Sequence, residues 1–135
     1  LKPFLAHDPG GESGWMIAQV AAAALSSENK SLAHPASADS VPTSANKEDF
    51  VSMGMGAALK LKQVVWNAAQ IVGIELLCAA QGVECHAPLK PGAGVGEGLR
   101  ILRKRITASR KDEVLSGKME KVREMILNGT FEGKD

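Results

Sequence analysis

With 135 residues the chain has the length of a single domain, and its 44% hydrophobic content is ordinary for a globular protein. Its 16 lysines and arginines against 15 aspartates and glutamates leave a net charge of +1, so neither a nucleic-acid partner nor an anionic membrane surface is expected. The sequence has no run of about 18 uninterrupted apolar residues, so we expect no membrane-spanning helix.

The cysteine content favours a reducing environment. Cys78 and Cys85 are too few and too isolated for the disulfide framework of a secreted protein, and no basic-then-apolar leader opens the chain. We therefore expect a cytoplasmic location. Because the sequence begins with Leu1 rather than methionine, we also expect it to be truncated, cleaved or incompletely represented.

The first predicted elements are an irregular entry and a helix. Residues 1–14 are rich in proline and glycine, which predicts a loop or entry strand, and Ser13 is a plausible helix N-cap. Residues 15–32 contain strong helix formers and no proline, which predicts a helix. Its alanines, at Ala18 and 21–24, favour close packing against other helices.

A long polar segment follows, with no apolar periodicity. Residues 33–47 are rich in Pro, Ser, Thr, Asn and Asp, so we predict a loop, and loops of this length are disproportionately functional. At its end, Ser44 and Asn46 could cap the next helix. Glu48 and Asp49 would then lie in its first turn, where the helix dipole favours negative charge.

The next element is predicted to be a single long helix over residues 48–83, on the order of 50 Å in length. Its apolar residues are not confined to one stripe, which is typical of a helix buried on all sides. Such a helix needs more partner helices than this chain offers. We therefore predict an all-α protein, a long-helix bundle that is completed by other chains, by an absent N-terminal part of the same polypeptide, or by both.

The remainder is predicted to be a connector and short helices. Residues 84–98 read as a connector rich in proline and glycine, and residues 99–135 as short C-terminal helices. The last helix is expected to carry Val114, Leu115 and the apolar residues up to Leu127. Asn128 and Gly129 form a good C-terminal stop.

Most of the candidate sites have a simpler structural explanation. The glycines at 92, 94, 96 and 98 lack a following Gly-Lys-Ser/Thr and a preceding strand, so a flexible connector is favoured over a phosphate loop. Cys85 and His86 have no second pair at zinc-ligand spacing. His7 and His34 have no partner identifiable from spacing and are expected to be structural.

The acidic pair Glu48 and Asp49 differs because it follows a long polar loop and precedes a buried helix. A carboxylate in such a position can be partly desolvated and held by backbone N–H groups, as a general base or a ligand for an imidazole often is. The alternative is that the pair only stabilises the start of the helix.

The sequence around this pair resembles a known family. The segment SGWMIAQVAAAALSSENKSLAHPASADSVPTSANKEDFVSMG, followed by IVGIELLCAAQGVE, is similar to the C-terminal active-site region of the histidine ammonia-lyases, in the family of aromatic amino acid ammonia-lyases. PLKPG and MEKVREMILNG continue the similarity more weakly. The resemblance covers essentially the whole chain.

The resemblance implies a larger, mostly helical, oligomeric lyase fold. Family members are homotetramers that eliminate ammonia from a small-molecule amino acid; histidine gives urocanate. Their electrophile is 4-methylideneimidazol-5-one, formed from an Ala-Ser-Gly tripeptide. The partners expected for this chain are accordingly the missing N-terminal part of the lyase and the neighbouring subunits.

The resemblance also assigns site residues. The catalytic glutamate of the family's SAN-x-ED motif falls on Glu48, which would contact the substrate imidazole and assist proton removal from the β-carbon, and Ser44 would line the same pocket. The usual motif has Gln at Lys47 and His at Phe50, which leaves tyrosine or phenylalanine as alternative substrates. Because phenylalanine-specific members usually have Gln at the position of Glu48, this residue favours histidine.

The chain lacks two of the family's catalytic elements. It contains no Ala-Ser-Gly, since Glu12-Ser13-Gly14 has the wrong first residue, and it contains no tyrosine to act as the family's second base. No metal site is expected. Alone, the chain should be inactive: either it contributes Glu48 to a shared site in a histidine ammonia-lyase, or it is a non-catalytic helical assembly module.

Overall fold

The computed structural model describes residues 1–132 and is helical, as the sequence predicts. Within that range the structure contains no strand, and its one isolated bridge joins Thr43 and Glu48. The elements in chain order are η1 (Pro3–Leu5), α1 (Met16–Leu32), η2 (Ala36–Ala38), η3 (Ser44–Asn46), α2 (Gly54–Glu84), α3 (Ala93–Arg103) and α4 (Ser116–Leu127).

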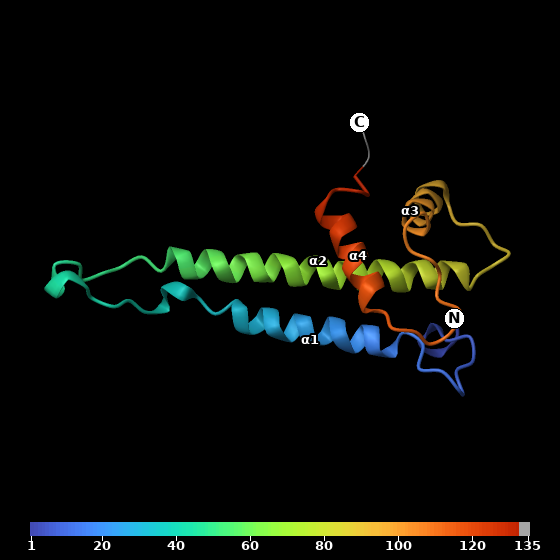
Figure 1. The fold of residues 1–135 in the computed structure, drawn as a ribbon, viewed down its shortest axis with the longest axis horizontal. Coiled ribbons are helices and arrows are strands. Elements are labelled where there is room, and N and C mark those ends of the chain that lie inside the picture. Colours follow the sequence, from blue (N-terminus) through green and yellow to red (C-terminus); the bar gives the residue numbers. More distant parts are fainter. Residues whose placement is uncertain (133–135) are drawn as a thin grey trace.

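The molecule is built on a helical hairpin. Helices α1 and α2 lie side by side and run antiparallel, and the chain reverses between them through a long loop at one end (Figure 1). Helix α4 crosses α2 nearer to the opposite end, where α3 and the N-terminal segment also lie (Figure 1). The hydrophobic core therefore gathers at the end of the hairpin remote from the loop.

The core is a single cluster of buried side chains. Its members come from the four α-helices and from the residues next to the start of α1 and the end of α3. They are Trp15, Ala18, Ile74, Leu77, Ala80, Leu102, Ile106, Val122 and Met125. Helix α4 approaches α2 closely at Gly73, where an added Cβ would lie 2.7 Å from Val122 Cγ1. The crossing is tied further by the Arg123 guanidinium, 4.1 Å from the Trp66 ring centroid.

The entry segment is irregular, as predicted, but α1 starts in a different way. Trp15 occupies the N-cap position and makes no side-chain cap hydrogen bond, so the prediction of a Ser13 cap is wrong. The Asp112 carboxylate instead accepts hydrogen bonds from the backbone N–H groups of Ser13 and Gly14, at 2.8 and 2.9 Å. Gly14 has a φ of +56°, and a Cβ there would lie 2.5 Å from the Phe4 carbonyl oxygen.

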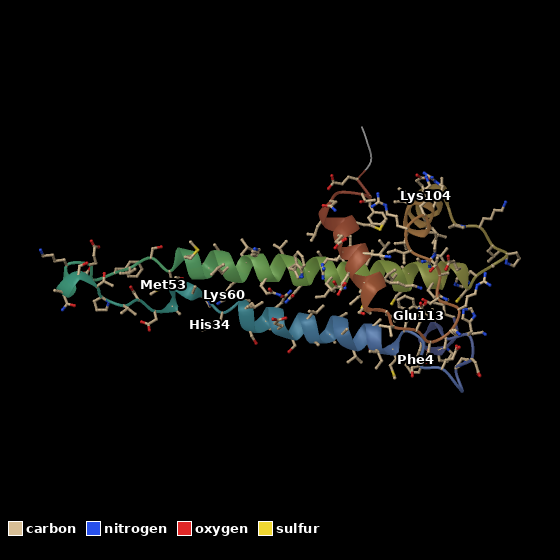
Figure 2. All side chains as sticks on the ribbon, viewed as in Figure 1. Phe4, His34, Met53, Lys60, Lys104 and Glu113 are labelled. Atoms are coloured by element: carbon tan, nitrogen blue, oxygen red, sulfur yellow. The ribbon has the colours of Figure 1, made fainter. Side chains whose placement is uncertain are left out.

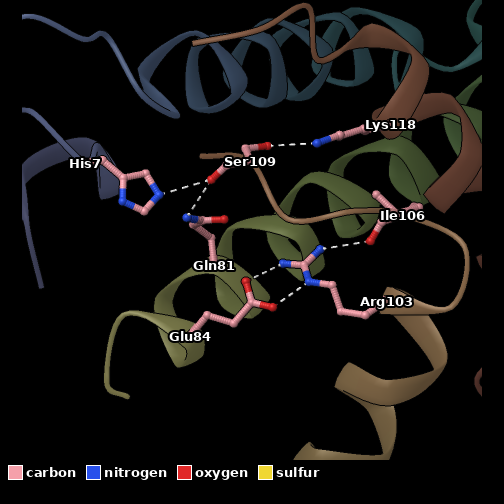
Figure 3. A network of polar contacts seen from close by, with 7 residues as sticks. All are labelled: His7, Gln81, Glu84, Arg103, Ile106, Ser109 and Lys118. Atoms are coloured by element: carbon pink, nitrogen blue, oxygen red, sulfur yellow. Dashed lines mark hydrogen bonds and ion pairs between the residues drawn. The ribbon is translucent and has the colours of Figure 1, made fainter. Parts of the chain in front are cut away.

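A second polar network fastens the C-terminal segment to the rest of the molecule (Figure 3). The Ser109 carbonyl accepts hydrogen bonds from His7 Nε2 and from the buried Gln81 side chain, both at 3.2 Å. Beside it, Arg103 forms a bidentate ion pair with Glu84, at 2.6 and 2.8 Å. His7 is thus a structural histidine, as predicted.

Helix α2 is long, as predicted, but it begins at Gly54 rather than near residue 48 and ends at Glu84. It is also not buried on all sides within the described chain. Its buried residues start at Asn67, whereas Leu59 and Leu61, nearer the loop, are each 62% exposed. The apolar surface of the N-terminal half therefore faces outward.

By length and composition alone, α2 is also long and apolar enough to cross a membrane. The prediction from uninterrupted apolar runs did not identify it because polar residues interrupt the helix. A buried core helix has the same composition, and polar residues such as Asn67 and Gln81 lie on the faces that pack against other segments.

Two boundaries in the C-terminal part also differ from the prediction. Helix α3 begins at Ala93, within the predicted connector 84–98, because Gly92 serves as N-cap and its carbonyl accepts the N–H of Gly96 at 2.8 Å. Helix α4 begins at Ser116, so Val114 and Leu115 precede it. Residues 133–135 of the predicted C-terminal region lie outside the described residues.

The predicted stop after α4 is confirmed. Gly129 adopts a φ of +64°, and its N–H donates to the Ile126 carbonyl at 3.0 Å, while the Thr130 N–H donates to the Met125 carbonyl at 2.9 Å. These two bonds form a Schellman motif, which satisfies carbonyls that the last helical turn leaves free.

Candidate active site

The predicted site loop connects α1 to α2 at the end of the hairpin remote from the core (Figure 1). It covers residues 33–53, so it is longer than the predicted 33–47. Its base is fixed to α2 by Lys60, whose Nζ donates to the backbone carbonyl of His34; the two residues lie together at the start of the loop (Figure 2).

Two pairs of contacts join the first half of the loop to its second half. Ser40 Oγ accepts the Val51 N–H at 2.8 Å and donates to the Val51 carbonyl at 3.1 Å. Closer to the tip, the Thr43 N–H donates to the Glu48 carbonyl at 2.9 Å, and the Glu48 N–H donates to the Thr43 carbonyl at 3.3 Å. The loop is therefore a narrow hairpin rather than an open coil.

The tip of the loop is conformationally strained. Ser44, Ala45 and Asn46 have φ values of 54°, 54° and 66°, in the left-handed region. Outside glycine this region costs on the order of 1–3 kcal/mol per residue, less for asparagine, and such strain concentrates at functional sites. The turn places Ser44 and Glu48 at its two ends, next to the Thr43–Glu48 bridge.

The predicted capping role of these residues is wrong. The N-cap of α2 is Met53, which makes no side-chain cap hydrogen bond, and the first turn of the helix contains no acidic residue. Glu48 cannot begin a helix here because its N–H and its C=O both bond to Thr43. Ser44 and Glu48 are instead loop residues with exposed side chains.

The exposure of Glu48 limits what it can do within these residues. A carboxylate in contact with water is a weak general base at neutral pH, and it becomes effective when neighbouring groups desolvate it or hold a reacting proton next to it. The described chain provides the backbone geometry around Glu48 but no covering wall. Any such wall has to come from another part of the protein or from another chain.

An open hollow lies on the helix side of the loop. It measures ≈ 380 Å³, and Phe50 lies on its wall. The other lining residues come from the segment around η2, from the end of the loop and from the start of α2: Pro35, Ala36, Ser37, Asp39, Val51, Ser52, Met53, Gly54 and Ala57. Glu48 does not line it. Within the described residues, Phe50 therefore lines this hollow and the candidate carboxylate does not.

The cysteines and the glycine-rich segment lie outside the loop. Cys78 and Cys85 are free thiols, and burial raises the pKa of Cys78. Residues 1–132 contain no group of three or more potential ligands that could hold a metal ion. Of the glycines predicted to form a flexible connector, those at 94, 96 and 98 belong to α3.

Three features of the site were not predicted from the sequence: the hydrogen bonds between Ser40 and Val51, the contact between Lys60 and His34, and a buried polar cluster around Asn67. The first two depend on partners 11 and 26 residues apart, which no local pattern identifies. Asn67 had a signal, since it is a polar residue inside an apolar stretch of α2.

Residues 1–104 match the family described as Aromatic amino acid lyase. The chain therefore belongs to the aromatic amino acid lyase family. Within it, the chain is 50% identical over 132 residues to histidine ammonia-lyase of Rhodospirillum rubrum and 51% identical over 132 residues to that of Anaeromyxobacter sp. (strain K). Each match covers 98% of this chain and 26% of the relative, so the chain spans about a quarter of these relatives' length.

Solved structures agree with this assignment. The crystal structure of histidine ammonia-lyase from Trypanosoma cruzi matches with a TM-score of 0.92 and 40% identity, covering 97% of this chain and 26% of that one. Tyrosine aminomutase from Streptomyces globisporus matches with a TM-score of 0.85 and 32% identity, covering 94% and 24%. The hairpin with its long loop is thus an arrangement shared with much larger enzymes.

Proposed function

We propose that the complete protein is an ammonia-lyase that converts L-histidine to trans-urocanate and ammonia in the cytoplasm, and that this chain contributes Glu48 to its active site. The observation that carries the proposal is the identity of about half of all residues with histidine ammonia-lyases over 98% of the chain, a span that includes the whole loop from 33 to 53.

In this reaction a proton leaves the β-carbon of histidine, the bond between the α-carbon and nitrogen breaks, and a carbon–carbon double bond forms. We assign Glu48 to contact with the substrate imidazole and to assistance in the proton removal. Ser44, at the other end of the same strained turn, would line the pocket. The paired loop supports this assignment because it holds both residues at its tip.

The electrophile would come from outside these 135 residues. The family uses 4-methylideneimidazol-5-one, which forms from Ala-Ser-Gly, and this chain has no such tripeptide. The Ser13-Gly14 pair does not substitute for it, because Glu12 rather than alanine precedes it. This chain therefore provides a positioned carboxylate and no part of the electrophile.

The missing walls of the site would come from the rest of the polypeptide and from neighbouring subunits of a tetramer. Two observations support this. The chain spans about a quarter of the length of its relatives, and the loop half of α2 exposes large apolar side chains on more than one side, including Met55, Leu59, Leu61 and Val65. Burying such a surface against further helices is favourable by about 25 cal/mol per Å² of apolar area.

A second candidate substrate is another aromatic amino acid, tyrosine or phenylalanine. The 32% identity with a tyrosine aminomutase favours it, as do Lys47 and Phe50, which depart from the usual histidine motif. Glu48 argues for histidine because a carboxylate can accept a hydrogen bond from an imidazole N–H. A non-catalytic assembly module is the remaining alternative.

The test is turnover by the complete protein on L-histidine, L-tyrosine and L-phenylalanine, with ammonia release and ultraviolet absorbance of the unsaturated product measured together. We expect kcat/KM for histidine to exceed the other two. A preference for tyrosine or phenylalanine would replace the substrate assignment, and no ammonia from any of the three would leave the assembly-module alternative.

A further inference from the structure

The loop half of the hairpin contains a polar cluster buried between α1 and α2. At its centre is Asn67, which is 1% exposed. Its Nδ2 donates hydrogen bonds to Glu28 Oε2 at 2.9 Å and to Asn29 Oδ1 at 3.0 Å, and its Oδ1 accepts one from Gln63 Nε2 at 2.9 Å. Both amide hydrogens and the carbonyl oxygen therefore have partners.

The position of this cluster sets it apart from the core. The hydrophobic cluster extends toward the loop only as far as Ala22 on α1 and Ile74 on α2. Asn67 is the buried residue of α2 that lies nearest to the loop. Between the core and the loop, the large apolar side chains of α2 such as Leu59 and Val65 face outward, and the polar side chain of Asn67 faces α1.

Such a cluster fixes the register of one helix against the other, and it contributes little to the stability of the fold. A helix face rich in alanine, like that of α1, provides few large side chains that would prevent one helix from sliding along the other. A buried asparagine that needs particular partners excludes other registers, usually at a cost in stability. Here its partners are two consecutive residues of α1, Glu28 and Asn29.

The register of α1 against α2 determines where the loop lies. Between Asn67 and the loop, the next contact across the two helices is the hydrogen bond from Lys60 to the His34 carbonyl, which lies at the base of the loop. A slip by one helical turn would displace the two ends of the loop by about 5.4 Å relative to each other. Such a displacement would strain the pairing of Ser40 with Val51 and of Thr43 with Glu48.

We propose that Asn67 is a positioning residue for the reaction, which fixes the register of α1 against α2 and thereby places Glu48 at the tip of the loop. It acts from roughly 20 Å along α2, the length of the 13 residues up to Gly54. The inference rests on the proposed function for its effect on turnover, but not for its effect on the loop.

The test compares the wild-type complete protein with Asn67→Leu, which keeps the branching and the number of heavy atoms of the side chain and removes its hydrogen bonds. We expect the melting temperature to stay within about 3 °C of wild type, since Glu28 and Gln63 are exposed and can bond to water. We expect kcat to fall at least about tenfold with a smaller change in KM, as for a carboxylate misplaced in the transition state. Hydrogen exchange of loop residues 36–51 should accelerate.

Two further variants separate positioning from stability. Leu77→Ala removes core packing on the same helix, so it should lower the melting temperature and leave both kcat of the folded enzyme and loop exchange near wild type. Asn29→Ala removes one partner of the cluster, so combining it with Asn67→Leu should reduce kcat no further than Asn67→Leu alone.

Loop exchange and turnover decide different parts of the inference. Unchanged loop exchange in Asn67→Leu overturns it, whatever the activity does. Faster loop exchange with unchanged kcat overturns the link to the reaction. If the wild-type protein releases no ammonia from any amino acid tested, the proposed function fails, and loop exchange alone then tests whether Asn67 fixes the position of the loop.

Discussion

At the scale of single residues, the functional candidates lie in the loop, and other polar residues hold distant parts of the chain together. Glu48 and Ser44 lie in an exposed, strained turn, whereas His7 and Asp112 join the N-terminal segment to the C-terminal segment and Gln81 joins α2 to it. The resemblance identified Glu48 from its motif. In the structure, the backbone of Glu48 pairs with that of Thr43 across a turn of residues with left-handed φ. The conformational preferences of Ser and Ala do not predict such a turn.

One residue prediction concerns acid stability. Lys118 Nζ lies 2.6 Å from Glu113 Oε1, and this hydrogen bond, with a second from Ser109, holds the pKa of Glu113 below its ordinary value. A carboxyl with a lowered pKa stabilises the fold above its unfolded pKa of about 4.3, and this stabilisation is lost as the pH falls through the lowered value.

Glu113→Gln in the complete protein should therefore cost less than about 1 kcal/mol near neutral pH, as expected for a partly exposed pair, and nothing near pH 2. Urea unfolding at several pH values measures this. Glu120→Gln, an exposed residue of α4 outside the ion pairs of the described chain, should show no such pH dependence. An equal cost at both ends of the pH range would contradict the role assigned to Glu113.

At the scale of elements, the interiors of helices were more predictable than their ends. The alanine-rich α1 and the apolar α2 followed from composition and from the absence of proline. The start of α2 did not, because Glu48 is committed to the loop hairpin by its bonds to Thr43. The early start of α3 was also missed, since its glycines suggested a connector while Gly92 provides an N-cap.

The α2–α4 crossing gives a prediction at this scale, with a matched control in the same helix. Gly73→Ala would place a Cβ 2.7 Å from Val122 Cγ1 and 3.4 Å from the backbone nitrogen of Arg123. Helix α4 would have to shift, at a cost of about 1–3 kcal/mol. Gly82→Ala would meet its nearest neighbour, Leu1 Cδ1, at 3.9 Å, so it should be neutral or stabilise by up to about 1 kcal/mol. Urea midpoints compare the two; equal midpoints would show that the crossing is looser than described.

At the scale of the whole molecule, the described chain has an incomplete interior. The loop half of α2 places apolar side chains outside and Asn67 inside, the reverse of what an isolated hairpin would need. The burial predicted for this helix depends on partner helices from outside the chain, so it stays a prediction. The same apolar pattern is what a helix buried among further helices of a larger bundle requires.

A charge on the outer face of α2 tests this directly. Leu59 is 62% exposed here, so Leu59→Glu would be harmless on a free surface, but a buried and unpaired carboxylate is strongly destabilising. In the complete protein we expect Leu59→Glu to reduce the assembled fraction in native mass spectra. Lys62→Glu, at an exposed polar position nearby, should leave it unchanged. Normal assembly of the Leu59 variant would mean that this face is solvent-exposed.

The central claim, that this chain supplies a catalytic carboxylate, is tested most directly by the kcat of Glu48→Gln in the complete protein with L-histidine. We predict a fall of at least about 100-fold, the usual contribution of a positioned acid or base, with the helical circular dichroism spectrum unchanged. Glu120→Gln, which makes the same change of charge on α4, should retain the wild-type rate. A Glu48→Gln enzyme that turns over histidine at close to the wild-type rate would contradict the claim.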